Sequence, residues 1–486
     1  MRKSKATHDD YQTLRDALAQ LPPGAAHQAN DPPSPDIIFT PRSHANALDP
    51  QRALVIGNRG VGKSFWSSVL THDAARARAA LAYPRLPLSR IRATLGYHEA
   101  AGKDDGPAPS RDVLASLHQK GHKPEAIWRS VLVSALRTEI GETLPDTLNG
   151  ILAWMEDDIE RAEAALRRAD RAFQERGEIF LFVFDALDRL GTSWDAITPL
   201  TEGILRLALD MRGFRAMKAK VFMRTDQSKD DSLFRFADAS KIRSDSVPLV
   251  WGRAELFGLL YNSLLQAQPA RDVLLRLAGE DSDSDLGTRL LNDEELQEVL
   301  FYRLAGEFMG AGPKRGRTYT WLYDHLADTF GETSPRSFIT AISRAAEFGP
   351  MPKDTPIDYN GIRAGVQKAS KVRVDQLKED YDWIKTVLDA LDGLEVPCDP
   401  SQFLGRWEER KTVSEMRKEA GDDTWKLPLE LATRPEDREE ALMNALRYIG
   451  VVEFRTESRI NMPDIFRVEA GIKRRGGVRP PSSRNG

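Results

Sequence analysis

The chain has 486 residues, which is too long for one ordinary hydrophobic core and predicts two or three domains. A hydrophobic content of 41% predicts packed globular structure, and a net charge of −4 excludes attraction of nucleic acid or an anionic membrane by overall charge alone. Cys398 is the one cysteine, which excludes an intrachain disulfide and favours a reducing compartment. The sequence has no secretory signal and no apolar run of membrane length. Together these features predict a cytoplasmic protein without a membrane partner.

The first half of the chain is predicted to alternate between helices and strands. Residues 1–50 are predicted to form an amphipathic helix near 10–20, which either covers an edge of the next domain or belongs to a floppy tail, and then a Pro-rich connector. The elements expected after it are strand 53–56, helix 62–72, strand 91–97, helices 111–119, 123–140 and 155–177, strand 179–184, helix 194–212 and strand 218–224. Because the strands are continuously apolar, residues 51–250 predict an α/β domain with a parallel sheet covered by helices on both faces.

The second half is predicted to be mostly helical. Residues 251–350 form a helical region, and 353–361 is a hinge into a further domain at 351–470. That domain has helices near 365–392 and 435–449, followed by VVEFR, a turn and RINMPDIFRV. Residues 471–486 are predicted to be a basic disordered tail.

Residues 57–64 read GNRGVGKS, which has the spacing of a phosphate-binding loop between an apolar strand and a helix. The glycines let the main chain wrap around phosphate oxygens, Lys63 would neutralise the β- and γ-phosphates, and Ser64 would ligate Mg²⁺. The alternative is a glycine-rich turn that caps a helix. The predicted nucleotide contacts are Gly57, Asn58, Arg59, Gly60, Val61, Gly62, Lys63, Ser64 and Phe65.

Acidic residues follow the apolar strand IFLFVF at 179–184. We expect Asp185 to complete the Mg²⁺ shell with Ser64, and Asp188 to orient or activate the attacking water. The alternatives are a strand-capping acid at 185 and an ordinary loop acid at 188. If strand 218–224 is adjacent in the sheet, Arg224 or Asp226 would lie beside these acids and sense the γ-phosphate; otherwise each is a surface charge.

The nucleotide is predicted to be ATP rather than GTP, because no Asn/Thr-Lys-x-Asp motif follows strand 218–224. No metal other than Mg²⁺ is expected, since the eight histidines lack metal-binding spacing.

The combination GNRGVGKS, FDALDRL, VFMRTD and SPRSFITAI resembles the KAP and STAND-type P-loop ATPases, relatives of the AAA+ ATPases, over roughly residues 50–345. The similarity is closest to a bacterial KAP-like family with a C-terminal winged helix. KAP proteins typically end the acidic strand in Asp-Asp-Leu-Asp-Arg, whereas this chain has Ala186 in place of the second acid. Either Asp188 activates water, or hydrolysis is slow and the protein is a nucleotide switch.

The resemblance also implies that residues 251–350 are a lid with an Asn-Pro-Arg element, which here reads Ser334-Pro335-Arg336. Serine and proline suit the cap and first turn of a helix. The resemblance makes Arg336 the lid arginine that reaches the γ-phosphate; sequence physics alone predicts a surface arginine in the first turn.

The C-terminal helix and the two short segments after it resemble the last helix and wing of a winged-helix domain. Such domains bind DNA or pack against a nucleotide domain, and both alternatives stay open. The candidate phosphate contacts are Arg455, Arg459, Arg467, Lys473, Arg474, Arg475, Arg479 and Arg484.

The sequence therefore predicts an ATPase that binds and hydrolyses Mg²⁺–ATP and couples nucleotide state to conformational change or assembly. The resemblance points to bacterial antiviral defence or signalling, with a homo-oligomer or a protein of the same system as partner. One alternative is a DNA-loading or transposition-helper ATPase, which would bind DNA through the C-terminal domain and tail. Another is an ATP-gated switch without hydrolysis, and a small-molecule kinase is a remote third.

Overall fold

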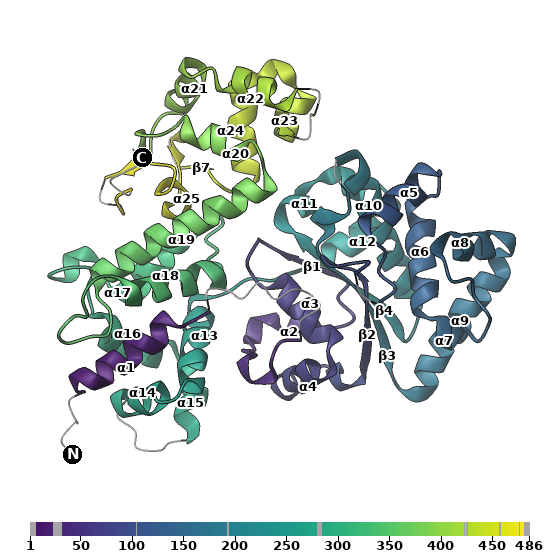
Figure 1. The fold of residues 1–486 in the computed structure, drawn as a ribbon, viewed down its shortest axis with the longest axis horizontal. Helices are drawn as coiled ribbons and strands as arrows, with labels where there is room; N and C mark the ends of the chain where they lie inside the picture. Colours follow the sequence, from purple (N-terminus) through teal and green to yellow (C-terminus); the bar gives the residue numbers. More distant parts are fainter. Residues whose placement is uncertain are drawn as a thin grey trace. The chain divides into compact units, whose positions relative to one another are not determined.

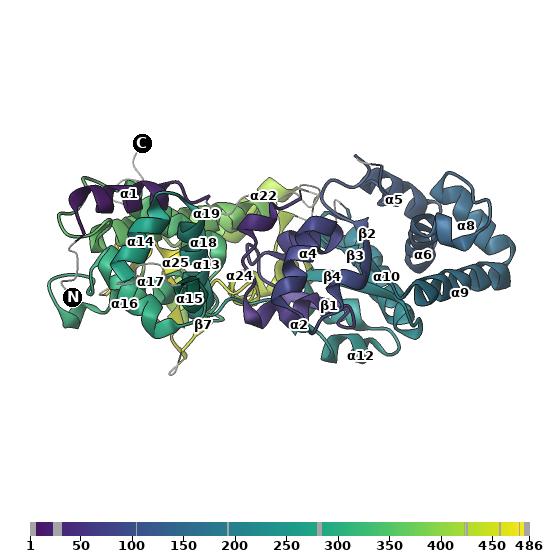
Figure 2. The same cartoon turned by 90° about the horizontal axis from the view of Figure 1, so that it is seen from below.

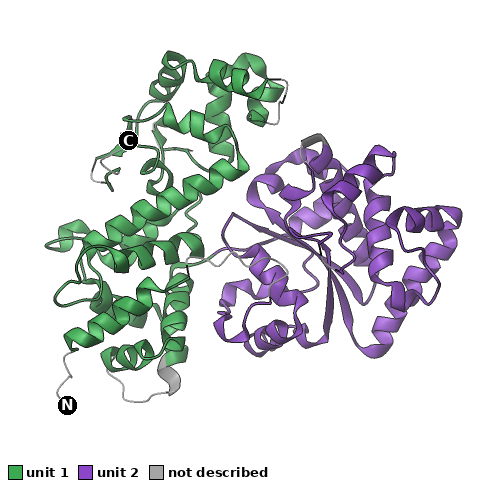
Figure 3. Cartoon of the chain, in the orientation of Figure 1, with its two compact units in different colours: residues 1–25, 251–486 green, residues 26–250 purple. Residues whose placement is uncertain are grey.

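The computed structural model describes residues 6–22, 32–103, 105–191, 194–278, 284–421, 423, 426–455, 458–475 and 477–480. The chain divides into two compact units (Figure 3). Unit 1 consists of residues 1–25 and 251–486, and unit 2 of residues 26–250. Unit 2 is therefore an insertion between the first helix of unit 1 and the rest of that unit.

Unit 2 is built on a parallel five-stranded sheet with the order β2-β3-β4-β1-β5 (Figure 1). The strands are β1 (Leu54–Gly57), β2 (Ile91–Tyr97), β3 (Ile179–Phe184), β4 (Met217–Arg224) and β5 (Val247–Pro248). The first four confirm the predicted strands to within one residue. Strand β4 lies between β1 and β3, and Gly57 pairs with Arg224 in register. The carboxyl ends of β1, β3 and β4 thus meet at one edge of the sheet.

Helices cover both faces of this sheet (Figures 1 and 2). Helix α3 (Lys63–Thr71) packs on one face, and α6 (Pro124–Ala135) and α10 (Trp194–Asp210) pack on the other. All six residues of β3 are buried, which explains its uninterrupted apolar sequence. The remaining α-helices of unit 2 are α2 (Ala45–Leu48), α4 (Asp73–Ala82), α5 (Arg111–Gln119), α7 (Arg137–Ile140), α8 (Leu148–Asp157), α9 (Ile159–Arg176), α11 (Thr225–Lys229) and α12 (Ala239–Ser244).

The prediction of one continuous helix over 155–177 is wrong, because the helical conformation is interrupted at Asp158. The side chain of Asp158 accepts a hydrogen bond from the Arg161 backbone at 2.9 Å and caps a new helix, α9. A capping acid inside a charged, helix-favouring run was not recognised from the sequence.

Unit 1 is helical around the close pair α18 (Pro335–Glu347) and α19 (Tyr359–Asp380). Glycines on α19 allow this approach: a Cβ at Gly361 would lie 2.6 Å from the Ala345 carbonyl oxygen, and one at Gly365 would lie 2.2 Å from that of Ala341. The other α-helices are α1 (His8–Ala19), α13 (Arg253–Gln266), α14 (Ala270–Ala278), α15 (Ser284–Leu290), α16 (Glu294–Ala305), α17 (Thr318–Leu326), α20 (Ile384–Asp389), α21 (Pro400–Glu409), α22 (Thr412–Ala420), α23 (Leu429–Thr433), α24 (Arg438–Tyr448) and α25 (Asp464–Arg467).

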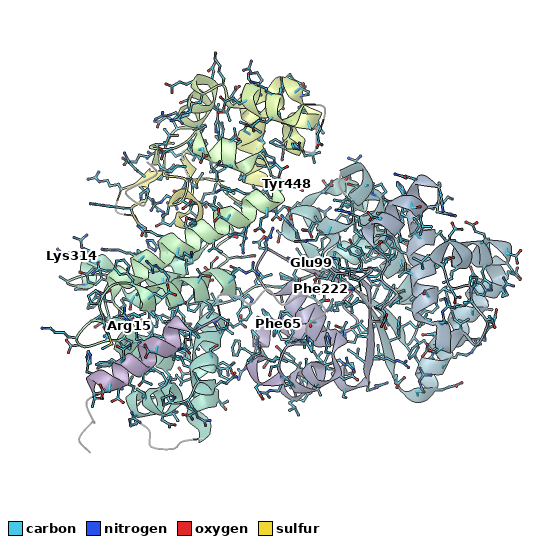
Figure 4. The ribbon with its side chains drawn as sticks, viewed as in Figure 1. Arg15, Phe65, Glu99, Phe222, Lys314 and Tyr448 are labelled. Carbon is cyan, nitrogen blue, oxygen red and sulfur yellow. The ribbon has the colours of Figure 1, made fainter. Side chains whose placement is uncertain are left out.

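Helix α1 is anchored in unit 1 through Arg15, which Figure 4 labels. The Arg15 guanidinium is buried and donates hydrogen bonds to the carbonyl oxygens of Pro356 at 3.1 Å, Phe348 at 3.0 Å and Gly349 at 2.8 Å. Residues 8–19 are thus joined to a segment more than three hundred positions away. The prediction had left open whether this helix covers the domain that follows it or belongs to a floppy tail.

The C-terminal part of unit 1 contains two small sheets. Strands β6 (Glu395–Val396) and β9 (Lys473–Arg474) pair in parallel, and β7 (Glu453–Phe454) and β8 (Ile460–Asn461) pair antiparallel. The described part of the predicted tail also contacts α19, since Gln367 donates to the Arg479 carbonyl at 2.9 Å. Arg484 lies outside the described residues. The winged-helix interpretation stays a prediction.

One candidate DNA contact in this region is wrong. Arg467 is fully buried, and its guanidinium donates to Asp464 at 2.8 Å and to the Ile472 carbonyl at 3.1 Å. A side chain at 0% exposure cannot reach a phosphate backbone. None of the helices in the described part of the chain is long and apolar enough to cross a membrane.

Candidate functional site

The loop between β1 and α3 has the backbone that its glycines require. Gly60 and Gly62 have φ values of 81° and 101°, in the left-handed region that side chains disfavour. A Cβ at Gly57 would lie 2.7 Å from Val61 and 3.1 Å from the Leu249 carbonyl oxygen. The chain therefore turns tightly from the strand into α3, whose first N–H groups have no partner within the helix. This places a ready anion site at the carboxyl edge of the sheet.

The side chain of Lys63 folds back over the loop and is held there by backbone carbonyl groups of the loop. Its ammonium group donates to the carbonyl oxygens of Gly57 and Asn58, each at 3.0 Å. Burial and, to a smaller extent, repulsion by Arg224 lower the pKa of Lys63 to about 8, although the neighbouring acids act in the opposite direction. The amine is thus mostly protonated at neutral pH, and an added phosphate would stabilise its charged form further.

Ser64 and Asp185 come together at the start of α3 and the end of β3. Asp185 is only 2% exposed and accepts a hydrogen bond from the Ser64 side chain. Burial raises the pKa of Asp185, while Ser64 and Lys63 oppose the rise. Its Oδ2 atom is buried and has no hydrogen-bond partner among the described residues. A buried carboxylate oxygen beside a hydroxyl fits a hard cation such as Mg²⁺, which accepts one or two protein oxygens and fills its shell with phosphates and water.

Arg224 lies between two acids at the same edge. It makes a bidentate pair with Asp226, at 3.0 Å and 2.9 Å, and its guanidinium lies 3.6 Å from Asp188. Strand β4 is adjacent to both β1 and β3. This adjacency is the condition under which the sequence predicted that Arg224 or Asp226 senses the γ-phosphate. The role itself stays a prediction.

Two contacts behind the acidic loop were missed by the sequence reasoning. The Tyr97 hydroxyl donates to the Arg189 carbonyl at 2.6 Å, and the Arg189 side chain pairs with Glu99 at 2.7 Å. Tyr97 ends β2 and Glu99 follows it; Figure 4 labels Glu99 and Phe222 of β4. The tripeptide Tyr-His-Glu at the end of a predicted strand was the available signal. These contacts fix the backbone next to Asp188.

The other predicted loop residues lie around the same turn. Val61 is buried beneath Gly57. Phe65, labelled in Figure 4, packs edge-on against Trp66 with ring centroids 5.3 Å apart. Asn58 and Arg59 belong to the loop itself, between β1 and α3.

Arg336 belongs to unit 1, whereas the phosphate loop belongs to unit 2. It occupies the first turn of α18, which Ser334 caps by accepting a hydrogen bond from the Ser337 backbone at 3.2 Å. Lys63, Ser64, Asp185, Asp188 and Arg224 are thus brought together within unit 2, and the γ-phosphate role of Arg336 stays a prediction. In the described residues, no group of three or more His, Cys, Asp or Glu side chains could hold a metal ion by itself.

The strand–loop–helix unit at the edge of a parallel sheet, with an acid at the end of a second strand, decides the fold. Unit 2 has the P-loop NTPase fold.

No protein-family model and no curated protein matches the chain. Solved structures that align with it include a Walker-type ATPase of Pyrococcus abyssi, at 13% identity and a TM-score of 0.40, covering 92% of this chain and 97% of that chain. The ORC2 protein of Aeropyrum pernix in ADPNP–ADP complexes aligns at 11% identity and a TM-score of 0.35, covering 85% of this chain and 84% of that chain. The ORC1 protein of the same organism in complex with DNA aligns at 12% identity and a TM-score of 0.33, covering 92% of this chain and 93% of that chain. Similarity this distant carries no argument about what this chain binds or does.

Proposed function

We propose that this chain is a Mg²⁺-dependent ATPase whose nucleotide state controls a conformational change or assembly. The observation that carries the proposal is the convergence of Lys63, the Ser64–Asp185 pair and Asp188 at one edge of the sheet in unit 2. The buried Oδ2 of Asp185, which has no hydrogen-bond partner among the described residues, offers an oxygen ligand that a cation would satisfy.

Each residue has a role that follows from its position. The loop N–H groups and Lys63 bind the phosphates, and Lys63 trades its two carbonyl partners for phosphate oxygens. Ser64 and Asp185 would hold Mg²⁺, which neutralises charge on the β- and γ-phosphates when bound. Asp188 is 37% exposed at its side chain, so it can accept a hydrogen bond from an attacking water.

Hydrolysis by this site is expected to be slow. Ala186 stands where the resemblance to KAP proteins expects a second acid, and the Arg224 guanidinium, 3.6 Å from Asp188, competes with an attacking water for that carboxylate. The same pairing favours the second candidate, a switch that binds ATP and barely turns it over. In the ATPase, γ-phosphate binding would draw Arg224 away from Asp188 and free the acid.

The remaining parts of the proposal rest on the resemblance. Residues 251–350 would act as a lid in which Arg336 reports the γ-phosphate, and residues 351–470 would be a winged-helix-like domain. Because unit 2 is inserted in unit 1, two chain segments connect the units. A conformational change in unit 2 can therefore be transmitted to unit 1 through both segments. A cytoplasmic role in bacterial defence or signalling, with a homo-oligomer or protein partner, completes the proposal.

The test is steady-state phosphate release from Mg²⁺–ATP, measured beside nucleotide binding. Asp188→Asn should abolish turnover and keep binding, because the contact described for Asp188 is its ion pair with Arg224 and not a hydrogen bond to the loop or to the Ser64–Asp185 pair. Asp146→Asn, an exposed acid of the same unit, is the matched control and should change neither. Binding by the wild type with no turnover would establish the switch. Turnover that survives Asp188→Asn would remove the assigned role of this acid.

A further inference from the structure

A short basic hairpin projects from unit 1 between α16 and α17. Phe308 and Arg317 form an antiparallel bridge, and the Met309 backbone donates to the Gly316 carbonyl at 2.9 Å. Its tip reads Gly-Ala-Gly-Pro-Lys-Arg-Gly, and the chain doubles back so closely that a Cβ at Gly310 would lie 3.1 Å from Arg315. The hairpin therefore presents Lys314 and Arg315 on a narrow turn; Figure 4 shows Lys314 at the outer edge of its unit.

The hairpin is continuous with one side of α19. The Arg363 guanidinium donates to the Met309 carbonyl at 3.1 Å, which ties the helix to the base of the hairpin. Positions 363, 367 and 371 recur every four residues and so lie along one stripe, with Lys368 beside Lys371. Gln367 on that stripe donates to the Arg479 carbonyl at 2.9 Å and adds the C-terminal segment to the same side. We call this surface the basic face: Lys314, Arg315, Arg363, Lys368, Lys371 and Arg479.

The six cations of the basic face are exposed, and none of them makes an ion pair with another described residue. This is unlike their neighbours: Arg317 on the same hairpin pairs with Glu298 at 3.2 Å, and Lys378 on the same helix pairs with Asp375 at 3.0 Å. Like charges gathered in this way repel one another, and an anionic ligand would relieve that repulsion.

We propose that the basic face binds the phosphate backbone of duplex DNA. From Arg363 to Lys371 the helix rises about 12 Å at about 1.5 Å per residue, and duplex DNA presents roughly one phosphate per 1.7 Å over such a length. A row of cations flanked by a protruding hairpin fits a repeating, linear array of charges. None of the exposed large hydrophobic side chains of the described residues belongs to the 308–317 hairpin or to α19, whereas interfacial membrane binding needs apolar insertion.

This proposal differs from the sequence-based expectation, which placed DNA on the winged-helix-like segments and the tail. Only Arg479 is common to both. It also stands apart from the ATPase proposal, because it needs no nucleotide.

The experiment is fluorescence anisotropy of the full chain with a labelled duplex, without nucleotide, across a salt series. Wild type should show log K falling against log salt with a slope near about −5, since each phosphate contact contributes about −0.9. Lys314→Gln/Arg315→Gln and Lys368→Gln/Lys371→Gln should each reduce the slope by about 2 and weaken binding by roughly tenfold or more at about 0.1 M salt. Two separate double variants guard against one of them misfolding.

The matched control is Lys385→Gln/Lys418→Gln, which neutralises two exposed lysines on α20 and α22 of the same unit and should leave slope and affinity unchanged. If the control loses as much affinity as the basic-face variants, the effect would come from net charge alone, which would overturn the proposal. Unchanged binding in both basic-face variants, or binding to phosphatidylserine vesicles without binding to DNA, would overturn it as well. Because ATP turnover is measured separately, its absence would leave this test intact.

Discussion

The perturbed pKa of Lys63 makes nucleotide binding depend on pH in a definite direction. Burial lowers this pKa from 10.5 to about 8 in the nucleotide-free chain, a shift on the order of 3 kcal/mol. Phosphates favour the charged amine, so the pKa in the complex should return to its ordinary value or above. Binding therefore takes up a proton to the extent that the free amine has lost one, which is about half a proton at about pH 8, little below about pH 7 and nearly a whole proton above about pH 9.

The magnitude follows from the two pKa values. At about pH 9 the free amine is roughly nine-tenths deprotonated, so about 0.9 proton should enter per nucleotide bound. The affinity should be nearly constant below about pH 7 and fall by about tenfold between about pH 7 and pH 9. A phosphate monoester has a second pKa of about 6, so a terminal phosphate is largely ionised across this range.

Calorimetric titration with a non-hydrolysable ATP analogue, in two buffers of different ionisation enthalpy, measures this uptake directly. Lys63→Ala should bind more weakly and take up no proton, which assigns the proton to this amine. If the wild type takes up no proton at about pH 9 and its affinity is flat from about pH 7, Lys63 does not exchange its carbonyl partners for phosphate as described.

Three further predictions concern single contacts. Tyr97→Phe removes the hydrogen bond to the Arg189 carbonyl that fixes the backbone next to Asp188. In steady-state assays kcat should therefore fall several-fold while KM stays unchanged. An equal change in KM would contradict a positioning role. Gly365→Ala should lower the free energy of unfolding by about 1–3 kcal/mol in urea, because the new methyl meets the Ala341 carbonyl, whereas Gly405→Ala on α21, with open space around it, should be neutral or slightly stabilising. Asp170→Ala should cost about 3 kcal/mol of unfolding free energy, because the buried Asp170 carboxylate accepts the backbone N–H groups of Ala216 at 2.7 Å and Met217 at 3.1 Å; a loss below about 1 kcal/mol would mean that water replaces it.

The sequence predicted the strands of unit 2 well because their signals are local. A fully buried parallel strand such as β3 is continuously apolar, and a phosphate loop needs glycine at positions with positive φ, so both patterns are readable over a few residues. Strand β5 was missed because it has two residues and one of them is a proline.

The order of the strands and the partners of single side chains were less accessible, because they depend on residues far apart in sequence. That β4 separates β1 from β3 is what brings Arg224 within 3.6 Å of Asp188, and the sequence could state this only as a condition. Helix α1 is an extreme case, since Arg15 is satisfied by carbonyls at positions 348–356. Arg467 failed as a DNA contact for a different reason: its partners Asp464 and Ile472 are close in sequence, but its complete burial depends on packing that the sequence does not show.

The most direct test of the central claim is equilibrium binding of ATP to the full chain, with and without Mg²⁺, for wild type, Lys63→Ala and Lys241→Ala. Lys241 is an exposed lysine of the same unit and serves as the matched control. We predict one ATP per chain, tighter binding with Mg²⁺, loss in Lys63→Ala and no change in Lys241→Ala. Wild-type protein that binds no ATP, or Lys63→Ala protein that binds it equally well, would contradict the assignment of the 57–64 loop as a nucleotide site.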